Sequence, residues 1–216
     1  EQMTASTFGL MGYEIPLIGI YGACSTMGEG LMLASMITAA GYADYTLAVA
    51  SSHFAAAEKE FRFPLNYGSQ RPLSATWTVT GCGAVIVGAE GMYGGNKKRP
   101  NARVTGVTTG KVIDYGQKDS MNMGACMAGA ACDTIYQNFM DFGRRPEDYD
   151  RIITGDLGYV GKTLLLSLLK EKGFDITKQH DDCGILIFNQ EKQDTHSGGS
   201  GCGCSGAMFA AHILRQ

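Results

Sequence analysis

Short apolar runs alternate with segments of helical spacing along this chain, and the alternation constrains its fold more than any other feature. Apolar runs of strand length cover residues 15–23, 45–52, 76–90, 102–116, 151–156 and 183–190. Segments with helical spacing cover residues 1–12, 25–39, 124–143, 158–173 and 204–216. Buried strands that alternate with helices are typical of α/β proteins. We therefore predict an α/β fold with a mainly parallel sheet.

The composition excludes several classes of protein. The chain has 216 residues, a formal net charge of −3 and 18% charged residues, so no electrostatic feature favours nucleic acid as a partner. Its one basic cluster, at residues 97–99, is expected to be a solvated turn. No apolar run approaches the roughly 18 residues of a membrane span, and no signal peptide is recognisable. The opening letters EQMTAS, which lack an initiator methionine, indicate a fragment or a trimmed sequence.

Seven cysteines are scattered along the chain, mostly inside apolar segments. An odd, scattered set favours reduced thiols in a cytosolic compartment over a framework of disulfides. Cys202 and Cys204 form a short pair, but a thiolate zinc site needs two such pairs, so we predict no metal site there.

Cys24 is the cysteine with the most informative position, because it lies where an apolar run ends and a helix begins. The unpaired N–H groups at a helix N-terminus carry partial positive charge, which stabilises a thiolate or a bound anion. A lone cysteine is also commonly a small buried residue. The sequence leaves both interpretations open: Cys24 is a catalytic nucleophile, or it is the floor of a binding pocket.

A weak internal repeat suggests two related halves. MGYEI (11–15) is similar to KGFDI (172–176), and ACSTMGEGLMLASMI (23–37) is similar to GCSGAMFAAHIL (203–214). Two copies of one strand-loop-helix unit would bring two helix N-termini close to a pseudo-twofold axis. With a boundary in the loop 94–101, we expect an N-terminal half over residues 1–97 and a C-terminal half over residues 98–216.

Several motifs carry a resemblance to a known family. GIYGACSTMGEGL, ADYTLAVASSHFAAAEKEFRFPLNYGSQRP, TWTVTGCGAVIVG, GKVIDYGQKD, DYDRIITGDLGYVG and GGSGCGCS together resemble the stage V sporulation protein AD family of the thiolase-fold superfamily. The resemblance implies a thiolase-like α/β fold of two βαβαβαββ halves. Relative to that pattern, the chain lacks the first N-terminal strand-helix-strand unit and the last two C-terminal strands.

The resemblance also implies that the condensing chemistry of the superfamily is absent. Thiolases use a histidine in a glycine-rich turn to accept the proton of the nucleophilic cysteine. Ser200 occupies that position here, and a neutral serine cannot accept the proton at neutral pH. The stretch 153–158, where ketoacyl synthases place a histidine, holds Asp156 and no imidazole. The chain therefore resembles a thiolase pocket without its base.

By resemblance, the expected role is the binding of dipicolinic acid (pyridine-2,6-dicarboxylate) and its uptake into developing spores. Such a ligand needs a flat apolar slot for its ring, and cationic groups or backbone N–H groups for its two carboxylates. The expected ligand-binding residues are Cys24, Ser25, His53, Arg62, Trp77, Asp156, Ser200 and Cys204. No cofactor is expected, although Ca²⁺ can accompany the ligand, and Asp156 would need a bridging cation beside a dianion.

Each of these residues also has a structural interpretation. Arg62 is placed for a salt bridge with Glu58, His53 for a hydrogen bond to backbone at a strand end, and Trp77 for the core. Asp156 can serve to orient neighbouring loops.

The expected partners are other stage V membrane proteins and a second copy of the chain, which would pair through an edge strand near residues 76–81. The expected location is cytoplasmic or peripheral on the forespore or spore inner membrane. One alternative is an acyltransferase or thioesterase with Cys24 as nucleophile and a base such as His53. Another is a scaffold with a vestigial pocket.

Overall fold

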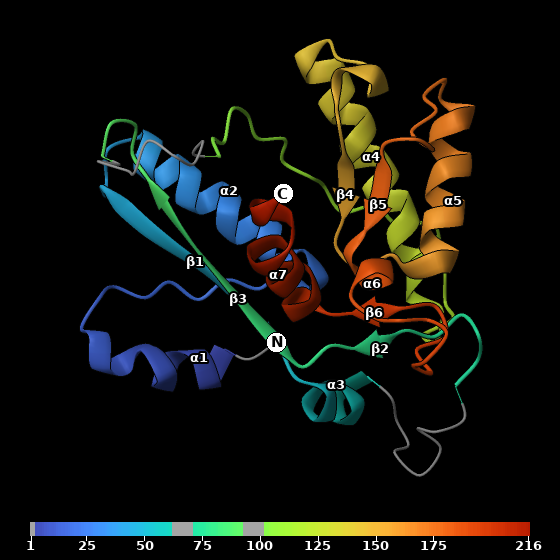
Figure 1. The fold of residues 1–216 in the computed structure, drawn as a ribbon, viewed down its shortest axis with the longest axis horizontal. Coiled ribbons are helices and arrows are strands. Elements are labelled where there is room, and N and C mark those ends of the chain that lie inside the picture. The colour runs from blue at the N-terminus through green and yellow to red at the C-terminus, as the bar shows by residue number, and fades with distance from the viewer. Residues whose placement is uncertain (1–2, 62–70, 93–101) are drawn as a thin grey trace.

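The computed structural model describes residues 3–61, 71–92 and 102–216, which form an α/β fold (Figure 1). The first part of the chain contains α1 (Met3–Leu10), α2 (Thr26–Ala39), β1 (Tyr45–Ser52), α3 (Phe54–Phe61), β2 (Trp77–Thr78) and β3 (Gly81–Gly88). The second part contains α4 (Met123–Phe142), β4 (Ile152–Thr154), α5 (Gly158–Glu171), β5 (His180–Asp182), α6 (Cys183–Leu186), β6 (Gly199–Ser200) and α7 (Cys202–Ala211).

The strands pair in three separate two-stranded sheets within the described residues. β2 pairs with β6 and β4 pairs with β5, both in the parallel sense. β1 and β3 pair in the antiparallel sense, from Tyr45 opposite Gly88 to Ser52 opposite Gly81. The expected parallel pairing is confirmed for β2–β6 and β4–β5, while β1 and β3, which form the longest pair among the described strands, are antiparallel.

Two helices, α2 and α7, pack against the β1–β3 ladder (Figure 1). Small residues allow this close approach: a Cβ added at Gly30 of α2 would lie 3.5 Å from the Cβ of Ala48 in β1. Gly83 of β3 lies directly against the backbone of Gly206 in α7, so an added Cβ at Gly83 would overlap that backbone, while one at Gly206 would lie a tight 3.2 Å from the nitrogen of Gly83. The glycines in these segments therefore fix how closely α7 approaches the strands.

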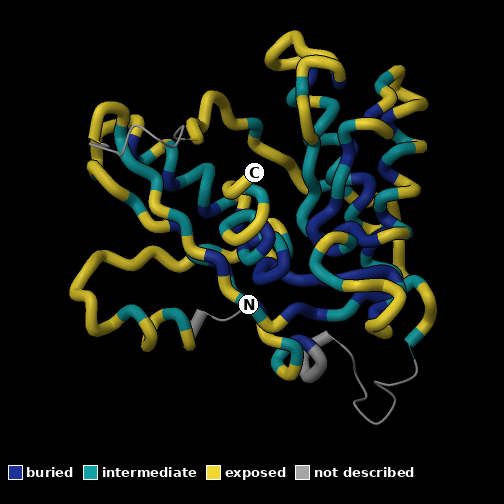
Figure 2. The backbone as a smooth tube through the Cα atoms, viewed as in Figure 1, coloured by how far each residue is buried: buried dark blue, intermediate teal, exposed yellow. Residues whose placement is uncertain are grey.

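An apolar core, separate from the contacts of α2 and α7 with the β1–β3 ladder, lies between α4 and α5. It consists of the buried side chains of Cys132, Phe139, Leu157, Leu165, Leu169 and Ile176. Figure 2 shows buried backbone concentrated there and along β6 and the start of α7, whereas α1 and the segment after it are mostly exposed. The well-packed part of the molecule therefore surrounds the β6–α7 junction.

Local signals explain the helix ends that the sequence predicts. The side chain of Asn122 accepts a hydrogen bond from the N–H of Ala125 and caps the start of α4. Gly143, with φ of 60°, and Gly173, with φ of 87°, follow the ends of α4 and α5 in the left-handed conformation that glycine tolerates. The helices expected over 25–39, 124–143, 158–173 and 204–216 are confirmed with small shifts at their ends.

Three predicted strands are wrong. Residues 15–23 and 102–116 form no strand, and residues 183–190 begin with α6 instead. An apolar run becomes a strand only where a neighbouring strand supplies hydrogen-bond partners, and neither of the first two segments has such a neighbour among the described residues. For the third, the carboxylate of Asp182 accepts a hydrogen bond from the N–H of Ile185, and this cap starts a helix directly after β5.

The segment 102–116 packs along α4 instead of joining a sheet. Thr108 accepts a hydrogen bond of 2.8 Å from the side-chain amide of Asn138, and Lys111 forms a 3.3 Å ion pair with Asp133. The division of the chain at residues 97 and 98 stays a prediction, because this loop lies outside the described residues.

Candidate functional site

Cys24 lies in a tight turn, Ala23–Ser25, that leads into α2. Ala23 has φ of 47°, a left-handed conformation that is unusual for alanine. The hydroxyl of Ser25 donates a 2.7 Å hydrogen bond to the carbonyl of Gly22, and the hydroxyl of Thr26 donates one of the same length to the carbonyl of Ala23. These hydrogen bonds hold the turn and fix the position of the Cys24 thiol.

The thiol of Cys24 donates a hydrogen bond to the carboxylate of Asp156. Asp156 follows β4 and is only 4% exposed. Its carboxylate also accepts a 2.8 Å hydrogen bond from the N–H of Gly201 and a 3.3 Å hydrogen bond from the hydroxyl of Ser200. Asp156 is therefore the central group that joins the Cys24 turn to the β6–α7 junction.

The β6–α7 junction forms the other wall of this site. Ser200 ends β6, Gly201 turns the chain with φ of 94°, and the buried Cys204 lies in the first turn of α7. The N–H of Gly203 donates a 3.0 Å hydrogen bond to the hydroxyl of the buried Ser52, which itself donates to the carbonyl of Val79. α7 contacts both the Cys24 turn and α2, so the two predicted helix starts do lie together.

Burial dominates the electrostatics of the site. It raises the pKa of the Asp156 carboxyl above its ordinary value, while the hydrogen bonds from Cys24 and Gly201 oppose that rise. Burial, with the nearby Asp156 charge, also raises the pKa of the Cys204 thiol, and burial raises that of Cys183 to about 12. Cys183 and Cys204 are therefore neutral thiols of the apolar lining, with no nucleophilic character at neutral pH.

Asp182, which the sequence analysis did not single out, supports the loop that carries Asp156. Its buried carboxylate accepts hydrogen bonds from the N–H groups of Leu157 at 2.8 Å and Gly158 at 3.0 Å. It also accepts one of 2.6 Å from the hydroxyl of Thr154. In the sequence, Asp182 stands directly before the apolar run 183–190, and an aspartate in that place is uninformative without the contacts.

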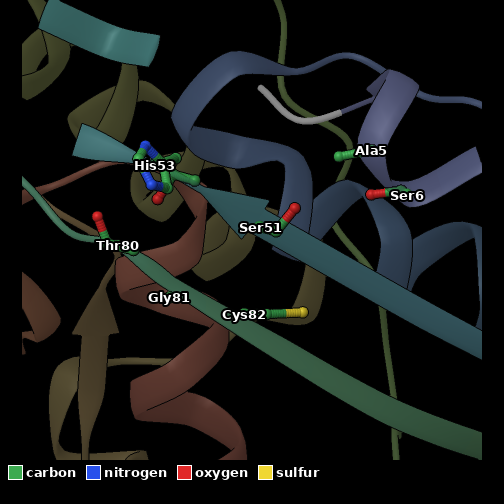
Figure 3. A pocket seen from close by; sticks show the side chains of 8 residues that line it. Ala5, Ser6, Ser51, His53, Thr80, Gly81 and Cys82 are labelled. Atoms are coloured by element: carbon green, nitrogen blue, oxygen red, sulfur yellow. The ribbon is translucent and has the colours of Figure 1, made fainter. Parts of the chain in front are cut away.

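His53, Trp77 and Ser25 have contacts of their own. His53 lines a cavity of about 400 Å³ with residues from α1, β1 and β3 (Figure 3), and its Nδ1 accepts a 3.2 Å hydrogen bond from the N–H of Ala55. The ring of Trp77 stacks on Phe54 with centroids 4.3 Å apart. The hydroxyl of Ser25 donates its hydrogen bond within the turn, to the carbonyl of Gly22.

The structure thus joins Cys24, Asp156 and Ser200, with Cys204 beside them. Arg62 lies outside the described residues. The role of every predicted site residue in ligand binding stays a prediction.

The four histidines of the chain form hydrogen bonds with partners other than Cys24. His53 accepts from Ala55, and His180 contacts Thr154. His196 contacts Asp194 and Pro72, and His212 contacts Gln216. A carboxylate, not an imidazole, is thus the hydrogen-bond partner that the structure assigns to the Cys24 thiol.

Metal-binding and membrane-spanning features are both missing from the part of the chain that the structure describes. No group of three or more histidine, cysteine, aspartate or glutamate residues is placed there to hold a metal ion. None of the described helices combines the length and the apolar character that crossing a bilayer requires.

Comparison with solved structures shows the fold. The chain is similar to AbyA1, a tetronic acid condensing enzyme, with a TM-score of 0.57 and 16% sequence identity over 99% of this chain and 64% of that one. This neighbour is a thiolase-like condensing enzyme, and the predicted thiolase-like α/β fold is therefore confirmed. An identity of 16% supports no statement about activity.

Comparison with known sequences shows the family. The family model for Stage V sporulation protein AD matches residues 1–216. Stage V sporulation protein AD of Bacillus subtilis (strain 168) is 44% identical over 203 residues, which cover 94% of this chain and 57% of that protein. With the fold and these two matches together, the chain belongs to the stage V sporulation protein AD family.

Proposed function

We propose that this protein binds dipicolinic acid at the Cys24–Asp156 site, without transforming it, and takes part in its uptake into developing spores. Membership of a sporulation protein family supports the setting. The observation that carries the proposal is the hydrogen bond from the Cys24 thiol to a buried carboxylate, in the position where a condensing enzyme would need a base and a reactive thiolate.

This hydrogen bond argues against nucleophilic catalysis. A thiolate forms readily beside a cation or an imidazolium, which lowers the pKa of the thiol. A nearby carboxylate has the opposite effect, because like charges disfavour ionisation of the second group. The charge of Asp156 already contributes to the raised pKa values of the Cys183 and Cys204 thiols. The carboxylate therefore does not help the Cys24 thiol to ionise, and we infer that Cys24 lines the pocket.

The same carboxylate constrains how a dianion can bind. Two carboxylates of one ligand would be repelled by an ionised Asp156 unless a positive charge or a proton lies between them. Burial raises the pKa of the Asp156 carboxyl, and Ca²⁺ prefers carboxylate oxygens as ligands. A proton on Asp156 or a bound Ca²⁺ would each let the carboxyl of Asp156 contact the ligand.

Calorimetry with the folded protein tests the proposal. Dipicolinic acid should release heat and raise the melting temperature, whereas its analogue without carboxylates, pyridine, should do neither. A parallel titration with Ca²⁺ and one with a chelator will show whether the cation accompanies the ligand. No heat and no thermal shift at millimolar dipicolinic acid would refute the proposed function.

A second candidate function is that of an acyltransferase or thioesterase, and one observation favours it: Asp156 is an acceptor placed to take the thiol proton of Cys24. In that case the thiol would lose its proton to Asp156 and its sulfur would attack the carbonyl carbon of an acyl thioester. The C–S bond to the leaving thiol would break, that thiol would take the proton from Asp156, and the acyl group would remain on Cys24. Incubation with acyl-CoA followed by intact mass measurement decides the question. A covalent adduct that disappears in Cys24→Ala supports the enzyme, and an unmodified mass supports the binding protein.

The proposal extends to the assembly in which the protein works. We propose that it forms a homodimer and acts beside stage V membrane proteins, either in the cytoplasm or peripherally on the forespore or spore inner membrane. Light scattering on the purified protein checks the dimer, and fractionation of sporulating cells checks the location.

A further inference from the structure

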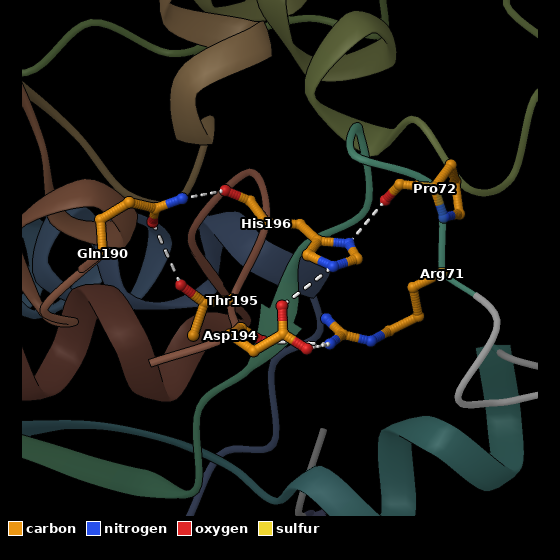
Figure 4. A network of polar contacts seen from close by, with 6 residues as sticks. All are labelled: Arg71, Pro72, Gln190, Asp194, Thr195 and His196. Carbon is orange, nitrogen blue, oxygen red and sulfur yellow. Dashed lines mark hydrogen bonds and ion pairs between the residues drawn. The ribbon is translucent and has the colours of Figure 1, made fainter. Parts of the chain in front are cut away.

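A cluster of charged side chains outside the Cys24–Asp156 site joins two segments that are far apart in the sequence (Figure 4). We call Arg71, Asp194 and His196 the Asp194 clamp. Nη2 of Arg71 donates hydrogen bonds to the carbonyl oxygen of Asp194 at 3.0 Å and to its Oδ2 at 3.2 Å. Nε2 of His196 lies 3.0 Å from Oδ1 of the same carboxylate. One carboxylate therefore connects the two cations.

Arg71 is unusually well buried for one partner of an ion pair. Its side chain is 5% exposed and its guanidinium lies over the ring of Trp77, 4.5 Å from the centroid, whereas the side chain of Asp194 is 80% exposed. An ion pair between exposed side chains contributes little, but a pair with one buried, stacked partner has a fixed geometry. The clamp is thus anchored through Arg71 and Trp77.

The two ring nitrogens of His196 both face hydrogen-bond acceptors. Its Nδ1 lies 2.8 Å from the carbonyl oxygen of Pro72, and its Nε2 faces the carboxylate of Asp194. Both partners can only accept hydrogen bonds, and a neutral imidazole has only one N–H to donate, so both contacts are satisfied only by the imidazolium. Gln190 donates to the carbonyl of His196 and holds this residue in its left-handed conformation, with φ of 49°.

The clamp lies at the start of a hydrogen-bonded ladder that runs to the Asp156 site. Ser197 N–H donates to the carbonyl of Ala75, Trp77 N–H to that of Gly198, and Val79 N–H to that of Ser200, at 2.8, 2.8 and 2.9 Å. The last residue of this ladder is Ser200, which, with Gly201, donates to the carboxylate of Asp156. The clamp therefore sets the register of the segment 71–79 against the segment 194–200.

We propose that Arg71 and His196 are positioning residues for the Asp156 site: with His196 in the imidazolium form, they hold Asp194, and through the β2–β6 ladder they keep Ser200 and Gly201 against the Asp156 carboxylate. Loss of the proton from His196 breaks one of its two contacts and loosens the ladder. The part of this inference that concerns ligand affinity rests on the proposed function, but the coupling between the clamp and the Cys24 thiol does not.

The first test follows the Cys24 thiol and needs no ligand. The rate of its alkylation by iodoacetamide is measured by peptide mass spectrometry in the natural protein and in His196→Gln, from about pH 6 to about pH 8.5, the range in which histidines titrate. We expect the variant to react about threefold faster or more at the acidic end, because the loosened site exposes the thiol. The two rates should converge at the alkaline end, because an imidazole that has lost its proton can donate to only one of the two acceptors.

Two further variants keep this test decisive. Asp194→Asn removes the charge that both cations share and replaces His196→Gln if that variant does not fold. Its Cys24 should react faster than that of the natural protein at every pH, with the largest difference at the acidic end, because the ion pair of Arg71 is lost at every pH. Lys111→Ala removes an exposed ion pair with Asp133 beside α4, away from the ladder, and should react like the natural protein at every pH. A variant-to-natural ratio that does not change with pH, or an equal change in Lys111→Ala, would overturn the inference.

The second test measures the affinity for dipicolinic acid over the same pH range. The natural protein should lose affinity relative to His196→Gln as the pH rises. Arg71→Lys, which loses the planar guanidinium that lies over the ring of Trp77, should bind more weakly throughout. If the natural protein does not bind dipicolinic acid while the alkylation ratio still depends on pH, the proposed function fails and the clamp stands. If the natural protein and His196→Gln both bind dipicolinic acid with the same pH profile, the coupling between the clamp and the ligand is refuted.

Discussion

The thiol of Cys24 donates a hydrogen bond to the carboxylate of Asp156, although the two residues lie in segments that are far apart in the sequence. The turn before α2 positions the first, and the loop after β4 positions the second. The contact can be interpreted in two ways: the carboxylate keeps the thiol protonated, or it accepts the thiol proton during catalysis.

Substitution of Asp156 by asparagine separates these two interpretations. If the carboxylate disfavours the thiolate, Asp156→Asn will increase the rate of Cys24 alkylation at neutral pH severalfold, because the charge that repels the thiolate is removed. If the carboxylate is instead a base, the same variant will react more slowly. The rate is measured with iodoacetamide, with the exposed Cys82 as an internal reference.

Asp182→Asn should destabilise the whole C-terminal part of the protein. The buried carboxylate accepts four hydrogen bonds, from Thr154, Leu157, Gly158 and Ile185. An asparagine would turn its NH₂ group toward donors, so we expect a loss of about 3 kcal/mol in the free energy of unfolding. Urea denaturation measures it, with Asp175→Asn as a control at an exposed aspartate, where a much smaller change is expected. Equal losses in both variants would contradict this account.

Gly83→Ala tests the close contact of α7 with β3. A Cβ at Gly83 would overlap the backbone of Gly206, and backbone on both sides cannot move aside. We expect a loss of about 3 kcal/mol or more in thermal or urea unfolding. Gly28→Ala in α2 is the matched control, because an added Cβ at Gly28 meets no atom within 4 Å. This substitution should stabilise the protein by about 0.5–1 kcal/mol, since alanine favours the helix over glycine. A tolerated alanine at position 83 would show that α7 packs differently.

The buried ring of His180 should make the stability of the protein depend on pH. Burial, with the charge of Lys162, lowers the pKa of His180 from 6.5 to about 4, and its buried Nδ1 has no hydrogen-bond partner. The unfolded chain therefore binds this proton more tightly, so the stability that the neutral ring confers is present above about pH 6.5 and is lost as the pH falls toward 4. The loss amounts to about 3 kcal/mol.

The measurement for His180 is urea denaturation at a series of pH values. His180→Gln, which keeps an N–H donor for Thr154, should show a weaker dependence on pH between 6.5 and 4 than the natural protein. Parallel pH profiles in the two proteins would show that other groups cause the acid destabilisation.

The helices were predictable because their signals are local. Asn122 and Gly143 mark the two ends of α4 in the sequence, and α5 ends before Gly173. The strands predicted at 45–52 and 151–156 are confirmed because both segments pair with another strand in the structure. The runs at 15–23 and 102–116 are as apolar but pair with no strand among the described residues, and their letters carry no sign of that difference.

The candidate site was predictable in part. The turn at Cys24 and the glycine-rich turn at Ser200 were visible as motifs, and Asp156 was visible as the residue in place of a histidine. The roles of Arg71, Asp194 and His196 could not be predicted. Charged residues in polar loops give the same sequence pattern whether their side chains contact only water or form ion pairs with each other.

The sequence by itself determined the thiolase-like α/β class, most helix boundaries and the absence of a histidine from the motif positions that a thiolase uses. Each of these follows from residue type, spacing or resemblance over a short stretch. Only the tertiary structure decided that the partner of Cys24 is a carboxylate and that a distant clamp leads to it. Hydrogen bonds and ion pairs depend on separations of a few ångströms, and the folding of distant segments against each other sets those separations.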